Sequence, residues 1–151
     1  MRRCSLALAL CAALVGARTC HGADAGVAVI MAADAAPGRW NQAALAQVFR
    51  QKKRFDDHGQ RLYGVNLPAT HPLRRAFSQQ VLGHSPEDMD DYWRDMYFHG
   101  ILPPYVLASE EAVIRFVAAT PGAIGYVSAC LADRRVSVIF HLDIASTCSH
   151  P

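Results

Sequence analysis

The strongest constraint on the fold lies between residues 118 and 127, where the sequence reads AATPGAIGYV. A helical pattern ends before Pro121, because the residue that precedes a proline disfavours the helical conformation. Pro121 and Gly122 favour a turn, and the apolar residues 123–127 predict a strand. Gly125 leaves one strand position without a side chain, which predicts close approach by a neighbouring helix or a ligand. The segment therefore predicts a packed helix that reverses directly into a strand.

The first 25 residues predict a secretory signal peptide. Arg2 and Arg3 precede an apolar run of about a dozen residues, and the small residues around Ala23 follow it. Such a run is too short to span a bilayer, which needs roughly twenty apolar residues. We expect cleavage after Ala25, which leaves one exported domain of residues 26–151. The mature protein is expected to be periplasmic or secreted and not to span a membrane.

Removal of the leader changes both the size and the charge of the chain. The first 25 of the 151 residues leave 126, enough for one domain with a substantial core. The leader contains three of the fifteen Lys and Arg residues and one of the thirteen acids, so twelve of each remain. A formally neutral chain gives no electrostatic reason to expect nucleic acid as a partner.

Segments with strand and helix patterns alternate along the mature sequence. Apolar and β-branched runs predict strands at residues 26–33, 62–67, 123–127 and 135–142. Capping residues predict helices after Asn41, from Pro72 after a cap at Thr70 or His71, after Ser85, and after Ser109. Strands separated by helices predict an α/β domain with helices packed on a small sheet.

The helix after Ser85 has the clearest amphipathic pattern in the chain. Its apolar residues recur at helical spacing and form a stripe of aromatic and methionine side chains: Met89, Tyr92, Trp93, Met96 and Tyr97. Stripes of this kind usually belong to a core. We therefore expect this helix to present the main hydrophobic face of the domain.

Two cysteines, Cys130 and Cys148, remain after cleavage. In an oxidising compartment a pair of cysteines predicts one disulfide, which would close a loop of about eighteen residues and contribute roughly 3 kcal/mol. The alternative is a buried thiol at Cys130 and a free thiol in the tail.

The sequence contains little that is typical of an enzyme. A nucleophile elbow, a phosphate-binding loop of the Walker type and the histidine spacings of zinc hydrolases are all missing from it. The six histidines of the mature chain are scattered. We therefore expect a non-enzymatic protein with no metal and no cofactor. The alternatives are a small secreted enzyme with a dispersed His/Asp site and a metal site assembled from distant residues.

The segment PATHPLRRAF predicts a candidate anion site. The start of a helix offers unpaired N–H groups and the positive end of the helix dipole, and Arg74 and Arg75 lie in its first turn. With Thr70 and His71 they form the candidate ligand-binding set. The alternative is an ordinary capped helix whose arginines remain in water or pair with acids such as Asp56.

The order of these segments resembles one lobe of the phosphate-type, or type II, periplasmic solute-binding proteins of ABC transporters. The resemblance covers residues 27–127, and its most specific parts are ATPGAIGYV and the pairing of AQVF with the later RRAF. It implies a small mixed sheet flanked by helices and a role as a phosphate ABC transporter substrate-binding protein. The implied partners are phosphate or another small anion and an ABC permease.

Two departures from the family pattern affect what the resemblance implies. The family motif Ser-Gly-Thr-Arg donates hydroxyl and backbone hydrogen bonds to the anion, and this chain reads His-Pro-Leu-Arg from His71 to Arg74. Only the arginine is kept, and each unpaired polar group on a buried anion costs about 1–3 kcal/mol. The family also closes two lobes over its ligand, so two copies of this chain or another protein would supply the opposing wall.

The alternative function is an envelope interaction module that keeps the fold and binds a partner through its surface, including the segment PPYVL (residues 103–107).

Overall fold

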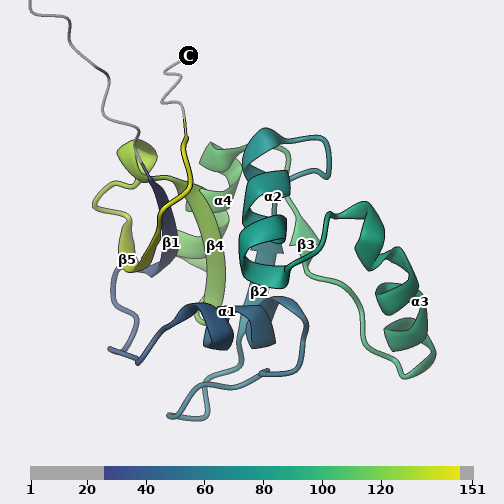
Figure 1. Cartoon of the computed structure of the whole chain (residues 1–151). Helices are drawn as coiled ribbons and strands as arrows, with labels where there is room; N and C mark the ends of the chain where they lie inside the picture. Colours follow the sequence, from purple (N-terminus) through teal and green to yellow (C-terminus); the bar gives the residue numbers. More distant parts are fainter. Residues whose placement is uncertain (1–25, 147–151) are drawn as a thin grey trace, which may run out of the picture.

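The computed structural model describes residues 26–146, drawn in colour in Figure 1. The predicted signal peptide lies outside the described residues, so its cleavage after Ala25 stays a prediction. Cys148 lies outside them as well, and its pairing with Cys130 also stays a prediction.

The centre of the molecule is a five-stranded mixed sheet in the order β3-β2-β4-β1-β5. The bounds are β1 Val27–Ala32, β2 Tyr63–Asn66, β3 Tyr105–Val106, β4 Ala123–Ser128 and β5 Val136–Leu142. β2 runs parallel to both β3 and β4, whereas β1 runs antiparallel to β4 and β5. The predicted α/β class and mixed sheet are confirmed. β3 was not predicted, since the sequence indicated only an extended crossing at Pro103 and Pro104.

Four α-helices connect the strands: α1 Gln42–Phe49, α2 Pro72–Phe77, α3 Asp90–Phe98 and α4 Glu110–Ala119. α2 continues into a short π-helix, Ser78–Leu82, and a 3₁₀ turn, Glu87–Met89, precedes α3. The caps predicted at Asn41, His71 and Ser109 are confirmed, whereas α3 begins after Met89, which provides no side-chain cap, rather than after Ser85. The Asn41 side chain accepts a hydrogen bond from the Ala44 N–H at 2.8 Å, and Ser109 Oγ accepts one from the Ala112 N–H at 3.2 Å.

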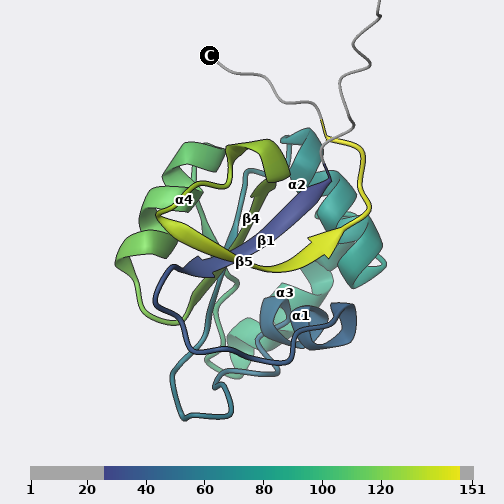
Figure 2. The same ribbon diagram turned by 90° about the vertical axis from the view of Figure 1, so that its left-hand side faces the viewer.

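Helices cover both faces of the sheet, as Figure 2 shows from the β5 edge: α4 lies on one side, and α1 and α2 lie on the other. β4 is buried along its whole length, so its alternating side chains meet both layers. Tyr126 stacks on Phe77 of α2 with ring centroids 3.8 Å apart. On the opposite face, Gly125 lies against Val113 and Val117 of α4, which confirms the close helix approach predicted from the glycine.

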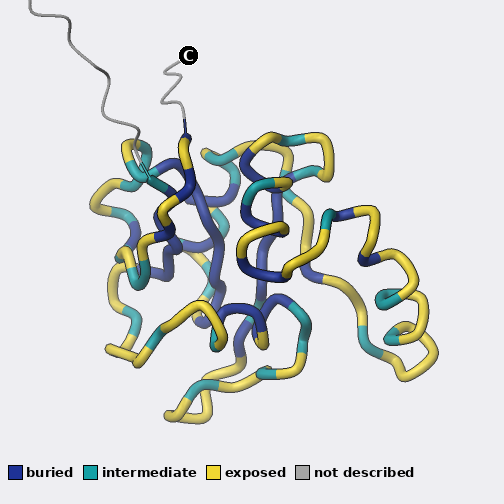
Figure 3. Tube along the Cα trace, viewed as in Figure 1, coloured by how far each residue is buried: buried dark blue, intermediate teal, exposed yellow. Residues whose placement is uncertain are grey.

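The prediction that the aromatic helix forms the main hydrophobic face is wrong. α3 contains no buried residue, and Figure 3 shows it as a mostly exposed arm that projects from the body. Tyr92 and Trp93 are only half-buried, and Tyr97 is 64% exposed. The amphipathic pattern correctly indicated a helix, but helical spacing does not reveal how much of the domain a stripe will cover. The core instead lies between the sheet and α1, α2 and α4.

Candidate functional site

The three parallel strands bring two helix starts to one edge of the sheet. The carboxyl ends of β2, β3 and β4 share this edge because the strands run in the same direction. α2 begins shortly after β2 ends, and α4 begins shortly after β3 ends. In α/β sheets, ligands bind in the crevice outside the carboxyl ends of the strands. This edge is therefore where the fold places a candidate site.

A cavity of about 510 Å³ lies at this edge. It is bounded by the start of α2, the first residue of α4, the last residue of β4 and the segment after β5: His71, Pro72, Leu73, Ala76, Glu110, Ser128, Ala145 and Ser146. Its volume is within the usual range for small-ligand pockets.

Glu110 gives this cavity a negative charge. Its carboxylate oxygen Oε2 accepts a short hydrogen bond from the backbone N–H of Ser128, which joins the start of α4 to the end of β4. The same N–H would otherwise be free to bind a ligand oxygen. An anion that enters the cavity therefore meets a carboxylate that already occupies one of the backbone donors.

The first turn of α2 has few donors left for an anion. His71 is the N-cap, and its ring nitrogen Nδ1 accepts a hydrogen bond from the Leu73 N–H at 3.2 Å. Pro72 has no N–H to offer. An imidazole that accepts at Nδ1 while neutral carries its proton at Nε2, so Nε2–H is the donor that His71 retains.

Arg74 points into the protein rather than toward the cavity. The residue is only 8% exposed, and it is not among the lining residues of the cavity. Its guanidinium lies beside the hydroxyl of Tyr126, which donates to Asn66 Oδ1 at 3.3 Å and accepts from the Leu67 N–H at 3.4 Å. Burial raises the pKa of Tyr126, and the positive charge of Arg74 partly offsets this effect.

Two buried polar groups on this face of α2 and of the π-helix that continues it lack hydrogen-bond partners among residues 26–146. One is Nη1 of Arg74, and the other is Oγ of Ser78, which is fully buried. The two residues are four positions apart, so they lie one helical turn from each other. Buried polar groups are nearly always satisfied, and an exception points to water or an ion at the same place. A cation and a hydroxyl together are suited to a small anion.

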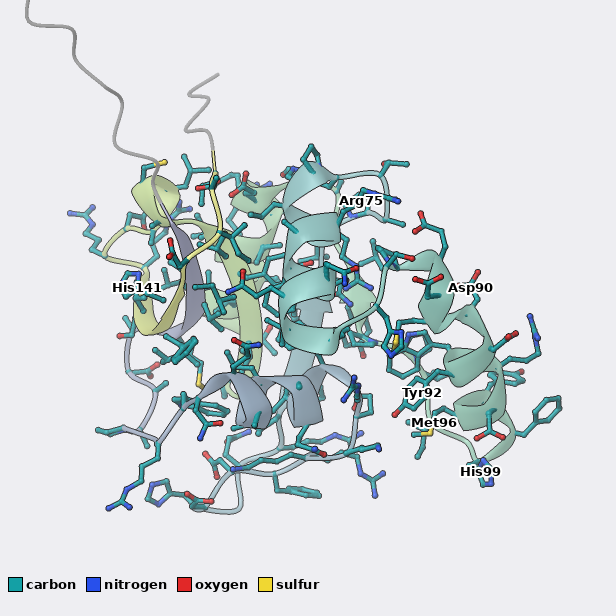
Figure 4. The ribbon with its side chains drawn as sticks, in the orientation of Figure 1. Arg75, Asp90, Tyr92, Met96, His99 and His141 are labelled. Atoms are coloured by element: carbon teal, nitrogen blue, oxygen red, sulfur yellow. The ribbon has the colours of Figure 1, made fainter. Side chains whose placement is uncertain are left out.

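The four predicted ligand residues do not converge on one point. Thr70 is exposed, His71 lines the cavity, and Arg74 faces the core. Arg75 lies on the outside of α2, where Figure 4 labels it. Its Nη1 donates to Glu87 Oε1 at 2.6 Å and to the backbone oxygen of Ala69 at 3.3 Å.

No motif in the sequence predicts Glu110, Ser78 or Tyr126 as site residues. Glu110 lies in the first turn of the helix predicted after Ser109, and its hydrogen bond with Ser128 depends on the position of β4 in the sheet. A signal for the buried arginine was present, since Arg74, Phe77 and Ser78 follow the i, i+3, i+4 spacing of one helical face.

Within the described part of the chain, no group of three or more His, Cys, Asp or Glu side chains is arranged to hold a metal ion. No helix among residues 26–146 is both long and apolar enough to cross a membrane.

Comparison with solved structures identifies the fold. The chain superposes on a protein described as a phosphate ABC transporter substrate-binding protein from Clostridium perfringens, solved with bound phosphate, with a TM-score of 0.62 and 17% identity. A phosphate transport receptor from Vibrio cholerae gives a TM-score of 0.60 and 16% identity. Each match covers 76% of this chain, but only 44% and 45% of the respective receptors. PstS from Borrelia burgdorferi matches 68% of this chain and 40% of its own, with a TM-score of 0.52 and 14% identity.

The fold is therefore that of one lobe of a phosphate-type solute-binding protein, and the resemblance predicted from the residues is confirmed at the level of the fold. The chain spans less than half the length of these receptors. No family model matches the sequence, and no curated protein matches it either.

Proposed function

We propose that this chain is an exported, non-enzymatic protein that binds phosphate or another small anion, as a single-lobe relative of phosphate ABC transporter substrate-binding proteins. The observation that carries the proposal is the buried, incompletely paired guanidinium of Arg74 near the carboxyl edge of the parallel strands. A buried cation without an acidic partner is costly, and an anion would offset that cost. The periplasm or the extracellular space is the proposed location, and an ABC permease or an envelope protein is the proposed partner.

Arg74 is the anchor of the proposed site, and the buried hydroxyl of Ser78, one helical turn away, is the unpaired group on the same face. His71 Nε2–H and the Thr70 hydroxyl are candidate donors at the edge of the sheet, apart from Arg74. Arg75 contributes positive charge from the outer side of α2, although its ion pair with Glu87 occupies it.

The same geometry limits the affinity. Pro72 provides no donor, the Leu73 N–H is used by His71, and the Ser128 N–H is used by Glu110. A phosphate dianion needs most of its oxygens bonded, because each unpaired polar group costs about 1–3 kcal/mol. We expect binding weaker than about 1 μM, or less than about 8 kcal/mol of binding free energy.

Calorimetry and thermal unfolding with phosphate, sulfate and small carboxylates at millimolar concentration test the proposal. Arg74→Met preserves the apolar stem, removes the charge and should abolish the ligand-induced rise in Tm. Arg75→Met is the matched control on the next position, and it should retain most of the ligand effect. No response to any of these anions in the wild-type protein would refute the proposed ligand class.

A second candidate function is an envelope interaction module that keeps the fold without the ligand. Five of the seven large hydrophobic side chains that are exposed in the described residues lie between positions 97 and 106, and they include Tyr105 and Val106 of the PPYVL segment. If this function holds, wild type and Arg74→Met capture the same partner equally, whereas Tyr105→Ser weakens the capture. Loss of capture on Arg74→Met would favour the anion-binding function instead.

A further inference from the structure

The α3 arm, Asp90–Phe98, ends in an exposed aromatic and acidic tip. Phe98 is 80% exposed and Tyr97 is 64% exposed, with the two rings 6.3 Å apart. Figure 4 shows that Tyr92 and Met96 face the body, while His99 lies at the free end of the arm. Asp95 and Asp91 lie one and two helical turns before Phe98, so the arm combines aromatic rings with negative charge, of which Asp91 is paired with Arg94 at 2.6 Å.

A groove of about 450 Å³ is lined by residues around the start of β2 and by residues 100–105, which follow the arm, and its properties are complementary to those of the tip. Its apolar lining includes Leu62, Tyr63, Ile101, Leu102 and Pro103. Arg54 and Arg61 also line it, and neither forms an ion pair within residues 26–146. The Arg61 guanidinium lies 5.4 Å from the centre of the Tyr63 ring, a cation–π distance.

We propose that two copies of this chain associate by placing the α3 tip of each copy in the groove of the other. Apolar anchors that fill a pocket dominate the energy of protein interfaces, and exposed aromatic residues are the commonest anchors. The acids of the arm meet the arginines of the groove, and this charge complementarity makes the association specific for a second copy of the chain. Because tip and groove belong to the same chain, reciprocal insertion about a two-fold axis gives a closed dimer.

The arm does not fill its own groove. The chain turns back at Gly100, which has a φ of 71°, and residues 100–105 then line the groove while Phe98 remains exposed on the arm. A second copy supplies the same tip without this restriction. The projection of α3 from the body, visible in Figure 1, leaves the tip accessible to another molecule.

The dimer surface is separate from the proposed anion site. The groove lies at the start of β2, beside Tyr63, whereas the candidate cavity lies at the carboxyl ends of the strands. The two share no lining residue. Association and anion binding can therefore be tested independently, and failure of one leaves the other unaffected.

Sedimentation velocity or light scattering of the purified protein over about 1–100 μM tests the aromatic anchor. Phe98→Ser should raise the dimer dissociation constant at least about tenfold, as expected for an interface hot spot. The matched control is Val138→Ser, which replaces a 40% exposed side chain on β5, at the opposite edge of the sheet. It should leave the dissociation constant unchanged. Far-UV circular dichroism checks that each variant is folded.

Charge reversal tests the reciprocal geometry. One variant reverses the groove (Arg54→Glu with Arg61→Glu), and the other reverses the tip (Asp91→Lys with Asp95→Lys). Each variant alone should be monomeric because like charges meet at both contacts. An equimolar mixture should form a heterodimer, since the reversed groove meets the reversed tip and the native groove meets the native tip.

Three results would overturn the proposal. The first is a wild-type protein that stays monomeric at 100 μM. The second is a dimer that Phe98→Ser leaves intact, which would place the interface elsewhere. The third is a mixture of the two charge-reversed variants that remains monomeric.

Discussion

At Gly125, α4 packs directly against β4. A Cβ atom built at this position would lie 2.5 Å from Cγ1 of Val113 and 3.1 Å from Cγ2 of Val117. Both valines are fully buried, and their branched side chains cannot swing away. We expect Gly125→Ala to lower the free energy of unfolding by about 1–3 kcal/mol, the usual cost of overpacking a core. Urea unfolding measures this cost.

Gly64 of β2 is the matched control for this prediction. It is also a buried strand glycine, but a Cβ atom there would meet its nearest neighbour, Cδ1 of Phe49, at an ordinary contact distance of 3.4 Å. Gly64→Ala should therefore cost far less. Val113→Ala should partly relieve the Gly125→Ala variant, so that the two changes together cost less than their sum. Equal costs at Gly64 and Gly125 would show that helix contact is not the cause.

At the same scale, the sequence indicated the close approach at Gly125 but not the burial of Arg74. A glycine between strand-forming residues leaves one strand position without a side chain, and this effect is visible in the local sequence. Whether an arginine lies in water or under a helix depends on where Tyr126 and Asn66 are brought by the sheet. The sequence therefore named Arg74 as a site residue without indicating that it faces the core.

At the scale of elements, Glu110 connects α4 to β4. A hydrogen bond to a carboxylate is about twice as strong as a neutral one, so Glu110→Gln should cost roughly 1 kcal/mol of stability while keeping an acceptor for the Ser128 N–H. The same change removes a negative charge from the cavity. We therefore expect this variant to bind the anion with several-fold higher affinity. Calorimetry with millimolar ligand measures the difference.

Glu111→Gln is the control for this effect, since Glu111 pairs with Arg135 and is not among the lining residues of the cavity. It should leave the anion affinity unchanged. If Glu110→Gln weakened binding instead, Glu110 would be a ligand-supporting residue rather than an internal competitor.

The elements themselves were predicted better than their arrangement. The strands at 27–32, 63–66, 123–128 and 136–142 and the caps at Asn41 and Ser109 follow from local patterns. The pairing of β1 with both β4 and β5 joins residues about a hundred positions apart, which no local pattern specifies. β3 has only two residues and exists because it pairs with β2, so the strand propensity of its residues did not predict it. The candidate cavity depends on this same non-local pairing.

At the scale of the whole molecule, Arg135, which directly precedes β5, connects α4 to the turn before β5. Its guanidinium donates to both carboxylate oxygens of Glu111, at 2.8 and 2.9 Å, and to Asp133 at 2.7–3.0 Å. These hydrogen bonds lower the pKa of Asp133 from 3.8 to about 2 and also hold the pKa of Glu111 below its ordinary value of 4.5. The acid stability of the protein should therefore depend on Arg135.

The sign of the pH dependence follows from these shifts. A carboxyl group whose pKa is lowered by folding stabilises the folded state above its ordinary pKa, and that contribution is lost as the pH falls through the folded value. The wild-type protein should exceed Arg135→Gln in Tm by a constant amount above pH 5. The difference should shrink between pH 4.5 and pH 2 and vanish below it. All three side chains are at the surface, so the difference at neutral pH should be small.

Arg134→Gln is the control, because Arg134 makes only a minor contribution to the lowered pKa of Asp133. Its Tm should follow that of the wild type across the whole pH range. Thermal unfolding in parallel buffers from pH 2 to pH 7 distinguishes the two variants. A gap between the wild type and Arg135→Gln that stayed constant down to pH 2 would mean that Arg135 stabilises the protein through packing of its stem rather than through these two carboxylates.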